Sequence, residues 1–331
     1  MSGSSPQLYQ AKTMKRRYNF TVNTEYQGYT IEEFLVQHIQ QFPINTIKKC
    51  IYDELVKVND FPAQLHQQLQ TNDEIHILLP KHNKQYKKQN PQIEVLYEDD
   101  GFLVVNKPPL IPVIPERWSH ETLFRDCIRT HLQNDAIIPR VVHRIDKEAS
   151  GAVIVAKNKE FERYFSGLFT KRQIKKKYLA IVAGTPADSG TVSLPIKQVS
   201  NKSTRMMVDE NEGKEAVTHF KVVEFFRDFA LLEIEIESGR THQIRVHMAS
   251  QGTPLAIDSL YGYRNTIKLS DIKSSYHHKK ERIEKPIISR LTLHAHQLEF
   301  IHPGKEETIQ ITAPLFKDLE VFLKKLRKYR S

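Results

Sequence analysis

The sequence predicts an α+β protein in which a large domain, built on a mixed, mostly antiparallel sheet, follows a small α/β domain. Between residues 91 and 331, short segments rich in Val, Ile, Leu and Phe are bounded by Gly and Pro, as strands commonly are. Several of them alternate apolar and polar residues, which is typical of antiparallel sheets and not of doubly wound parallel ones. Residues 81–90 are rich in lysine and lack apolar periodicity, so we expect a linker between the two domains.

The small domain is expected to span residues 17–80, after a polar, disordered tail at residues 1–16. Thr30 and Glu33 have the spacing of a capping box and precede apolar residues at helical intervals, so a helix is predicted to begin there. Asn45 is placed to cap a second helix. Short alternating segments predict two strands, at residues 56–59 and 74–77.

The elements of the large domain, residues 91–331, are predicted from the same patterns. Asp100 and Gly101 form a tight turn between two apolar strands, which predicts a hairpin. Asn158 can cap a helix that carries an aromatic face, and a closing helix is predicted from Leu315 to Leu326. Further strands are predicted at residues 151–156, 178–184, 216–223, 229–236 and 298–301.

Composition narrows the class of protein without naming a partner. The chain has 331 residues, is 39% hydrophobic and carries a formal net charge of +10. A basic surface attracts polyanions, and composition leaves RNA, DNA and anionic membranes open. No apolar run reaches the roughly 20 residues of a membrane span, and no signal sequence is apparent, so we expect a cytoplasmic protein that does not associate with membranes.

Cysteine and histidine usage argues against a metal centre. Cys50 and Cys127 are isolated from each other and are expected to be reduced, structural thiols. His242 and His247 are the nearest approach to a ligand pair, but their spacing of five does not place both on one helical face. We therefore predict no metal site.

Two stretches concentrate charge where a loop meets regular structure. Arg144 and Asp146 lie between two apolar runs, and loops held by a rigid sheet are where chemistry concentrates. Further on, Arg240 is predicted in a turn, Thr241 is placed to cap a helix, and Arg245 lies on that helix. Taken alone, an aspartate beside an arginine is more often a structural ion pair than a catalytic group.

The order of these motifs resembles the RluA family of RNA pseudouridine synthases. The segment from His143 to Asp146, followed by Ser150-Gly151, is similar to the family's signature loop. The other similar segments are Asn106-Lys107-Pro108, Tyr178 after a lysine-rich run, Gly239 to His247, and Asp258-x-Leu260-Tyr261-Gly262. The resemblance covers about residues 91–315, and residues 17–80 resemble, more loosely, a small S-four-like RNA-binding domain. Two positions depart from the family pattern: Ile145 replaces leucine and Ala149 replaces threonine.

The resemblance implies the pseudouridine synthase catalytic fold and an isomerase that converts uridine in RNA to pseudouridine. No oxidation or group transfer occurs, so no cofactor is expected. Asp146 would be the catalytic nucleophile or base acting on the ribose, with an acylal and a glycal route both open. Arg245 would pair with this carboxylate, and Tyr178 would pack against the uracil. Arg144 would fill the place that the extruded base leaves.

The expected partner is RNA, with large-subunit ribosomal RNA favoured over transfer RNA, and the protein is expected to act as a monomer. Besides Arg144, the residues predicted to bind substrate are His143, Lys107, Arg240, His242, Lys171, Arg172 and Lys175. Two alternatives remain open at this point. One is an RNA-binding assembly factor without activity, and the other is a carboxylate glycoside hydrolase, which needs a second acid that the sequence does not show beside Asp146.

Overall fold

The computed structural model divides the chain into two compact units, which are described separately. The described residues up to Pro80 belong to the first unit and those from Ile93 onward to the second. The structure describes residues 15–39, 47, 50–51, 53–65, 67–80, 93–113, 124–134, 137–200, 203–274, 276, 284–305 and 307–330.

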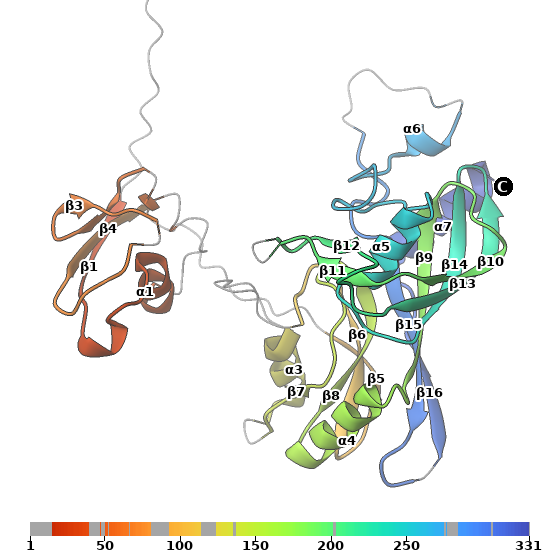
Figure 1. Ribbon diagram of the computed structural model, residues 1–331, viewed down its shortest axis with the longest axis horizontal. Helices are drawn as coiled ribbons and strands as arrows, with labels where there is room; N and C mark the ends of the chain where they lie inside the picture. Colours follow the sequence, from red (N-terminus) through yellow and green to blue (C-terminus); the bar gives the residue numbers. More distant parts are fainter. Residues whose placement is uncertain are drawn as a thin grey trace, which may run out of the picture. The chain divides into compact units, whose positions relative to one another are not determined.

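The first unit is a four-stranded antiparallel sheet with a helix against it (Figure 1). The strand order is β1 (Lys15–Thr21), β4 (Glu74–Pro80), β2 (Val56–Val58) and β3 (Phe61–Pro62), and the helix is α1 (Ile31–His38), preceded by a short 3-10 turn at Thr24–Tyr26. The predicted capping box is confirmed, since the Thr30 N–H donates to Glu33 Oε2 and the Glu33 N–H donates to Thr30 Oγ1. The predicted cap at Asn45 lies outside the described residues.

A ten-stranded sheet forms the second unit, with the order β10-β13-β14-β9-β15-β8-β6-β5, while β16 pairs with β15 and β7 pairs with β8 (Figure 1). Only the pairing of β15 with β8 is parallel among the pairs of described strands, so the predicted mixed, mostly antiparallel sheet is confirmed. The strands are β5 (Glu94–Glu98), β6 (Phe102–Lys107), β7 (Arg140–Val141), β8 (Ser150–Ala156), β9 (Lys175–Ala183), β10 (Ser189–Ser193), β13 (Val217–Phe226), β14 (Phe229–Ile236), β15 (Leu293–Ile301) and β16 (Thr308–Thr312).

Helices pack on this sheet and bury its apolar side chains. Asn158 caps α4 as predicted, because its side chain accepts the Phe161 N–H at 3.0 Å. The helices are α3 (Phe124–Leu132), α4 (Lys159–Thr170), α5 (Gln243–Ser250), α6 (Leu269–Ile272) and α7 (Lys317–Tyr329), and a separate hairpin joins β11 (Ile196–Gln198) to β12 (Met206–Val208). Among the described helices, none has both the length and the apolar character needed to span a membrane.

Strand β8 begins at the motif Ser150-Gly151, and the glycine is required by close packing. Gly151 has φ +120°, and a Cβ atom at this position would overlap the backbone of Ala295 on the parallel neighbour β15. Glycine adopts such a φ without steric cost. The residue therefore allows β15 to lie directly against the strand that follows Asp146.

We expect Gly151→Ala to destabilise the second unit by about 3 kcal/mol or more, because the added carbon meets backbone atoms that cannot rotate away. Gly167→Ala is the matched control. Nothing lies within 4 Å of a Cβ built at Gly167, in helix α4, so this change should be neutral or stabilise by up to about 1 kcal/mol. Chemical denaturation followed by circular dichroism measures both, and equal effects of the two substitutions would contradict the packing argument.

Candidate active site

Asp146 lies in the loop that joins β7 to β8, with its side chain 14% exposed. The loop turns back on itself, since the Ala149 N–H donates to the Asp146 carbonyl at 3.1 Å. Ala149 is buried, so a main-chain hydrogen bond supports the loop at the position where the family pattern has threonine. In the described part of the chain, Oδ1 of Asp146 accepts no hydrogen bond and is free for a substrate.

Arg245 reaches the Asp146 carboxylate from helix α5. Its Nη1 is 3.4 Å from Asp146 Oδ2, while its Nε and Nη2 each donate to the Asp258 carboxylate at 2.8 Å. Burial by itself would lower the pKa of Arg245, but the hydrogen bonds and charge of Asp258, with the charge of Asp146, raise that pKa above its ordinary value. Because the guanidinium is only 1% exposed, it needs these paired carboxylates to remain charged in the interior.

Tyr178, on strand β9, is 9% exposed. Burial, followed by the negative charge of Asp146, raises the pKa of the Tyr178 phenol above its ordinary value, so the hydroxyl keeps its proton at neutral pH. The structure thus brings together all three residues predicted to be catalytic, and places the tyrosine within electrostatic reach of the aspartate.

Lys107 supports the Asp146 loop from the protein interior and is not positioned to bind RNA. It is completely buried at the end of β6, and its Nζ donates to the carbonyls of Pro108, Ile111 and Lys147 at 2.8 to 3.1 Å. The prediction that Lys107 binds substrate is therefore wrong, because no part of it reaches the surface. Burial lowers the pKa of Lys107 to about 7, against the opposing charge of Asp146.

His143 also has a supporting position. The Ile154 N–H donates to its Nε2 at 2.9 Å, and its ring stacks on Phe169 with centroids 4.5 Å apart. Burial, and then the charge of Lys176, lowers the pKa of His143 to about 3, so the ring is neutral. The predicted substrate contact through His143 stays a prediction, because strand β8 occupies only Nε2 and the ring is half-buried, with no hydrogen bond to Nδ1 among the described residues.

His242 begins helix α5 in the left-handed conformation, with φ +55°, so Thr241 is not the helix cap that the sequence predicts. His242 Nδ1 and the Tyr261 hydroxyl are 2.8 Å apart, and the Met206 N–H donates to the same hydroxyl at 2.7 Å. The Arg245 guanidinium lies over the Tyr261 ring at 5.2 Å. Sequence reasoning did not assign roles to Tyr261 or Asp258, although both belong to the segment Asp258-x-Leu260-Tyr261-Gly262 that marks the family.

The remaining predicted substrate-binding residues lie on the surface. Arg144 is exposed on the Asp146 loop, and Arg240 is exposed with its Nε donating to the Glu215 carbonyl at 3.1 Å. Lys171 and Arg172 are exposed after α4. Lys175 instead pairs with Glu299 at 2.8 Å. No hydrogen bond or ion pair joins Lys171, Arg172 or Lys175 to the Asp146 loop in the described residues.

A second carboxylate does lie beside the motif. Glu148 Oε2 is 3.8 Å from Arg245 Nη1, and its side chain is 38% exposed. The absence of a nearby acid, which the sequence suggested, is therefore wrong. Neither this cluster nor any other group of His, Cys, Asp and Glu within the described ranges is arranged to hold a metal ion.

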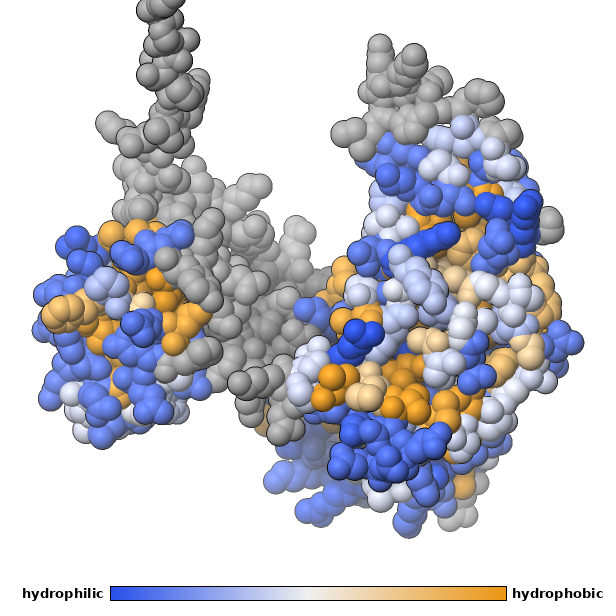
Figure 2. Space-filling model, turned by 45° about the horizontal axis from the view of Figure 1, so that its top comes forward, coloured by the Kyte–Doolittle hydropathy of each residue, from blue (hydrophilic) through white to orange (hydrophobic). Residues whose placement is uncertain are grey.

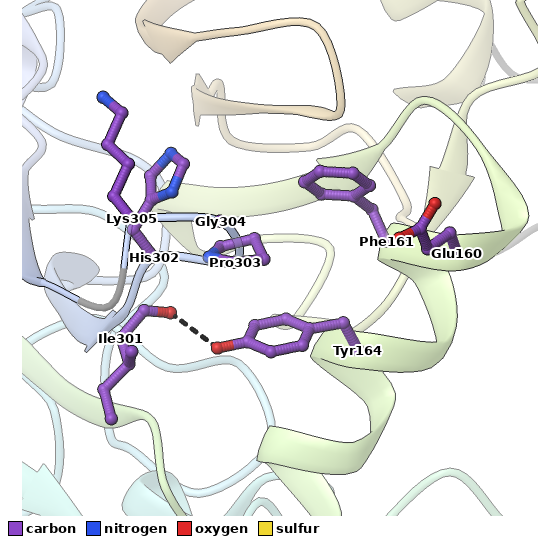
Figure 3. Close-up of a pocket in the computed structure, with 8 residues that line it drawn as sticks. All are labelled: Glu160, Phe161, Tyr164, Ile301, His302, Pro303, Gly304 and Lys305. Carbon is purple, nitrogen blue, oxygen red and sulfur yellow. Dashed lines mark hydrogen bonds between the residues drawn. The ribbon is translucent and has the colours of Figure 1, made fainter.

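An open surface pocket of about 740 Å³ lies elsewhere, between α4 and the segment that follows β15 (Figure 3). Figure 3 shows Tyr164 reaching across it, where its hydroxyl donates to the Ile301 carbonyl at 3.0 Å. None of the predicted site residues lines this pocket.

Comparison with known proteins identifies the family. The sequence pattern described as RNA pseudouridylate synthase matches residues 101–250. The uncharacterized RNA pseudouridine synthase YlyB of Bacillus subtilis (strain 168) is 33% identical over 318 residues, which cover 94% of this chain and 98% of that protein. The chain belongs to the RNA pseudouridylate synthase family. The resemblance to the RluA enzymes is thereby confirmed, and the protein is an isomerase that acts on uridine in RNA.

Other relatives of this pseudouridine synthase agree. A ribosomal large subunit pseudouridine synthase D from Neisseria meningitidis serogroup B is 30% identical over 321 residues, 96% of this chain and 84% of that protein. The solved structure of Human RNA Pseudouridylate Synthase Domain Containing 4 matches with a TM-score of 0.57 and 25% identity, over 71% of this chain and 93% of that one. The comparison thus favours the isomerase over the glycoside hydrolase that the sequence left open.

Lys107→Met removes the ammonium but keeps an unbranched apolar side chain. We expect kcat/KM for pseudouridine formation to fall by about 10-fold or more, because the carbonyls of Pro108, Ile111 and Lys147 lose their donor and the Asp146 loop is held less firmly. In the wild type, activity should decline as the pH rises above about 7, where the ammonium gives up one of the three protons it donates. A pH–rate profile of both proteins measures this.

Stability should change with pH in the opposite direction. Between a pKa of about 7 in the folded protein and the ordinary 10.5, the unfolded chain binds a proton that the folded chain does not. The free energy of unfolding of the wild type should therefore rise with pH relative to Lys107→Met, by up to about 1.4 kcal/mol per pH unit. Identical pH dependence of the two proteins, in both activity and stability, would show that Lys107 does not titrate in this range.

Proposed function

We propose that the protein isomerises specific uridines in structured large-subunit ribosomal RNA and that Asp146 is its catalytic group. The observation that carries this proposal is the ion pair of Asp146 with the buried Arg245, whose other side is anchored on Asp258. The ribosomal target is supported by the relatives that are named ribosomal large subunit pseudouridine synthase D.

The reaction breaks the bond between the ribose C1′ and uracil N1 and joins C1′ to C5 of the same base. Asp146 must act on the ribose as an ionised carboxylate, either as nucleophile or as base. Its pairing with Arg245 uses Oδ2 and leaves Oδ1 open toward the substrate. The arginine places a positive charge 3.4 Å from the Asp146 carboxylate.

The anchor on Asp258 has a consequence for the reaction. If Asp146 loses its negative charge during turnover, Arg245 still has two hydrogen bonds to a fully buried carboxylate. An unpaired guanidinium in the interior would cost several kcal/mol. Asp258 therefore keeps Arg245 in place while Asp146 changes charge.

Tyr178 and Arg144 complete the proposed site. The buried Tyr178 ring offers an aromatic face to the uracil. Its hydroxyl is protonated at neutral pH, because burial and the charge of Asp146 raise the pKa of the phenol. Arg144 is exposed on the same loop, where a long cation can enter the RNA stack after the uridine leaves it.

Asp146→Asn should lower the rate of pseudouridine formation by about 10⁴-fold or more, because the amide can neither attack nor deprotonate the ribose. The control is Glu148→Gln, the same change in charge two residues away, which should cost less than about 10-fold. The test deletes the gene in its native host, maps pseudouridine in ribosomal and transfer RNA, and complements the deletion with each variant.

The pseudouridine that is lost on deletion identifies the target RNA. If pseudouridine is lost only in transfer RNA, the target is transfer RNA and not ribosomal RNA. Restoration by Asp146→Asn would remove Asp146 from the mechanism, and loss at no position would favour an assembly factor.

Binding to RNA should weaken steeply with salt, since exposed cations contact phosphates. Lys171→Ala and Arg172→Ala should each reduce the slope of log K against log salt by about 1. Lys175→Ala, a neighbouring substitution of a cation already paired with Glu299, should change the slope less. Filter binding at several salt concentrations measures the slopes, and three equal slopes would place the phosphate contacts elsewhere.

A further inference from the structure

Leu110 has a backbone conformation that leucine rarely adopts. Its φ is +67°, in the left-handed region where the Cβ of an ordinary residue crowds the backbone. Glycine or asparagine is the usual residue at such a position. A strained conformation of this kind persists only where its surroundings impose it, and such residues gather at functional sites.

The surroundings that impose it are those of the Asp146 loop. The Leu110 N–H donates at 2.8 Å to the carbonyl of Lys147, the residue after Asp146. The ammonium of Lys107 binds the same carbonyl, together with those of Pro108 and Ile111 on either side of Leu110. The Lys147 carbonyl thus joins residues 107–111 to the Asp146 loop, and the backbone of Leu110 is fixed relative to that loop.

The side chain at this strained position points outward. Leu110 is 59% exposed, while its neighbour Ile111 is 8% exposed. Single exposed apolar residues are common, and Figure 2 shows hydrophobic residues interspersed with hydrophilic ones over the visible face of the second unit. The exposure of Leu110 is informative because it is combined with strain and with the hydrogen bond to the catalytic loop. A residue needed only for folding would be buried here or would be a glycine.

We propose that Leu110 is a substrate-contacting residue, whose side chain packs against an unstacked nucleobase next to the uridine that enters the site. A uridine that leaves its stack exposes the apolar face of the neighbouring base, and an inserted apolar side chain covers such a face. Arg144 then contacts the RNA by charge and Leu110 by apolar contact. This inference rests on the proposed function.

The test separates binding from stability, because the two should move in opposite directions. Leu110→Gly relieves the strain, so the Tm should rise by about 2 to 4 °C. It also removes the apolar contact, so affinity for large-subunit RNA from the deletion strain should fall by about 10-fold. Affinity is measured by filter binding with the full chain in an Asp146→Asn background, which prevents turnover, and kcat/KM is measured with Asp146 intact.

Two further variants complete the comparison. Leu110→Met keeps an apolar side chain of similar volume and should bind within about twofold of the parent. Val223→Ala truncates a residue that is 57% exposed on β13, which β14, β9 and β15 separate from β8 in the sheet. This change should alter neither affinity nor kcat/KM.

Affinity and kcat/KM of Leu110→Gly within twofold of the parent would overturn the inference. A fall in Tm together with affinity would also overturn it, because it would assign Leu110 a structural role, as would a Leu110→Met that binds as weakly as Leu110→Gly. The proposed function fails separately. A protein that binds this RNA through Leu110 and forms no pseudouridine contradicts the reaction alone, whereas pseudouridine formed at an unchanged rate by Leu110→Gly contradicts only the role of Leu110.

Discussion

The buried guanidinium of Arg245 needs carboxylate partners, and this requirement connects helix α5 with the Asp146 loop. Arg245 has almost no exposed surface, and two parallel hydrogen bonds to Asp258 satisfy one side of it. Its remaining nitrogen faces Asp146, which is 99 positions earlier in the chain. A buried charge of this kind is stable only when its partners are in place. Folding of the second unit and assembly of the site therefore depend on the same contacts.

The loop that carries Asp146 is held mainly through its backbone. Lys107 binds the Lys147 carbonyl from below, and the Ala149 N–H bonds to the Asp146 carbonyl. His143 fixes the beginning of the loop to strand β8 by accepting the Ile154 N–H. Because these contacts use main-chain groups, they do not depend on a hydroxyl at position 149. This explains how alanine can occupy a position where the family pattern has threonine.

The same support distinguishes residues that hold the loop from residues that are exposed around it. Lys107 is fully buried with its ammonium bound to three carbonyls, and His143 is half-buried with its Nε2 bound to strand β8. Arg144 and Leu110 are exposed. His143 and Arg144 are adjacent in the Asp146 loop, and Lys107 and Leu110 both bind the Lys147 carbonyl of that loop. Membership of a motif therefore does not indicate which side chains contact RNA.

Elements whose causes are local could be predicted from the amino-acid sequence. The capping box at Thr30, the cap at Asn158 and the alternation of the sheet strands depend on residues a few positions apart, and spacing is sufficient to predict them. The motifs likewise indicated Asp146, Tyr178 and Arg245. The folded chain was needed to establish that Lys107 is buried, that Asp258 anchors Arg245, and that Leu110 is strained yet exposed. Burial and pairing depend on which distant segments pack together, and no local pattern records that.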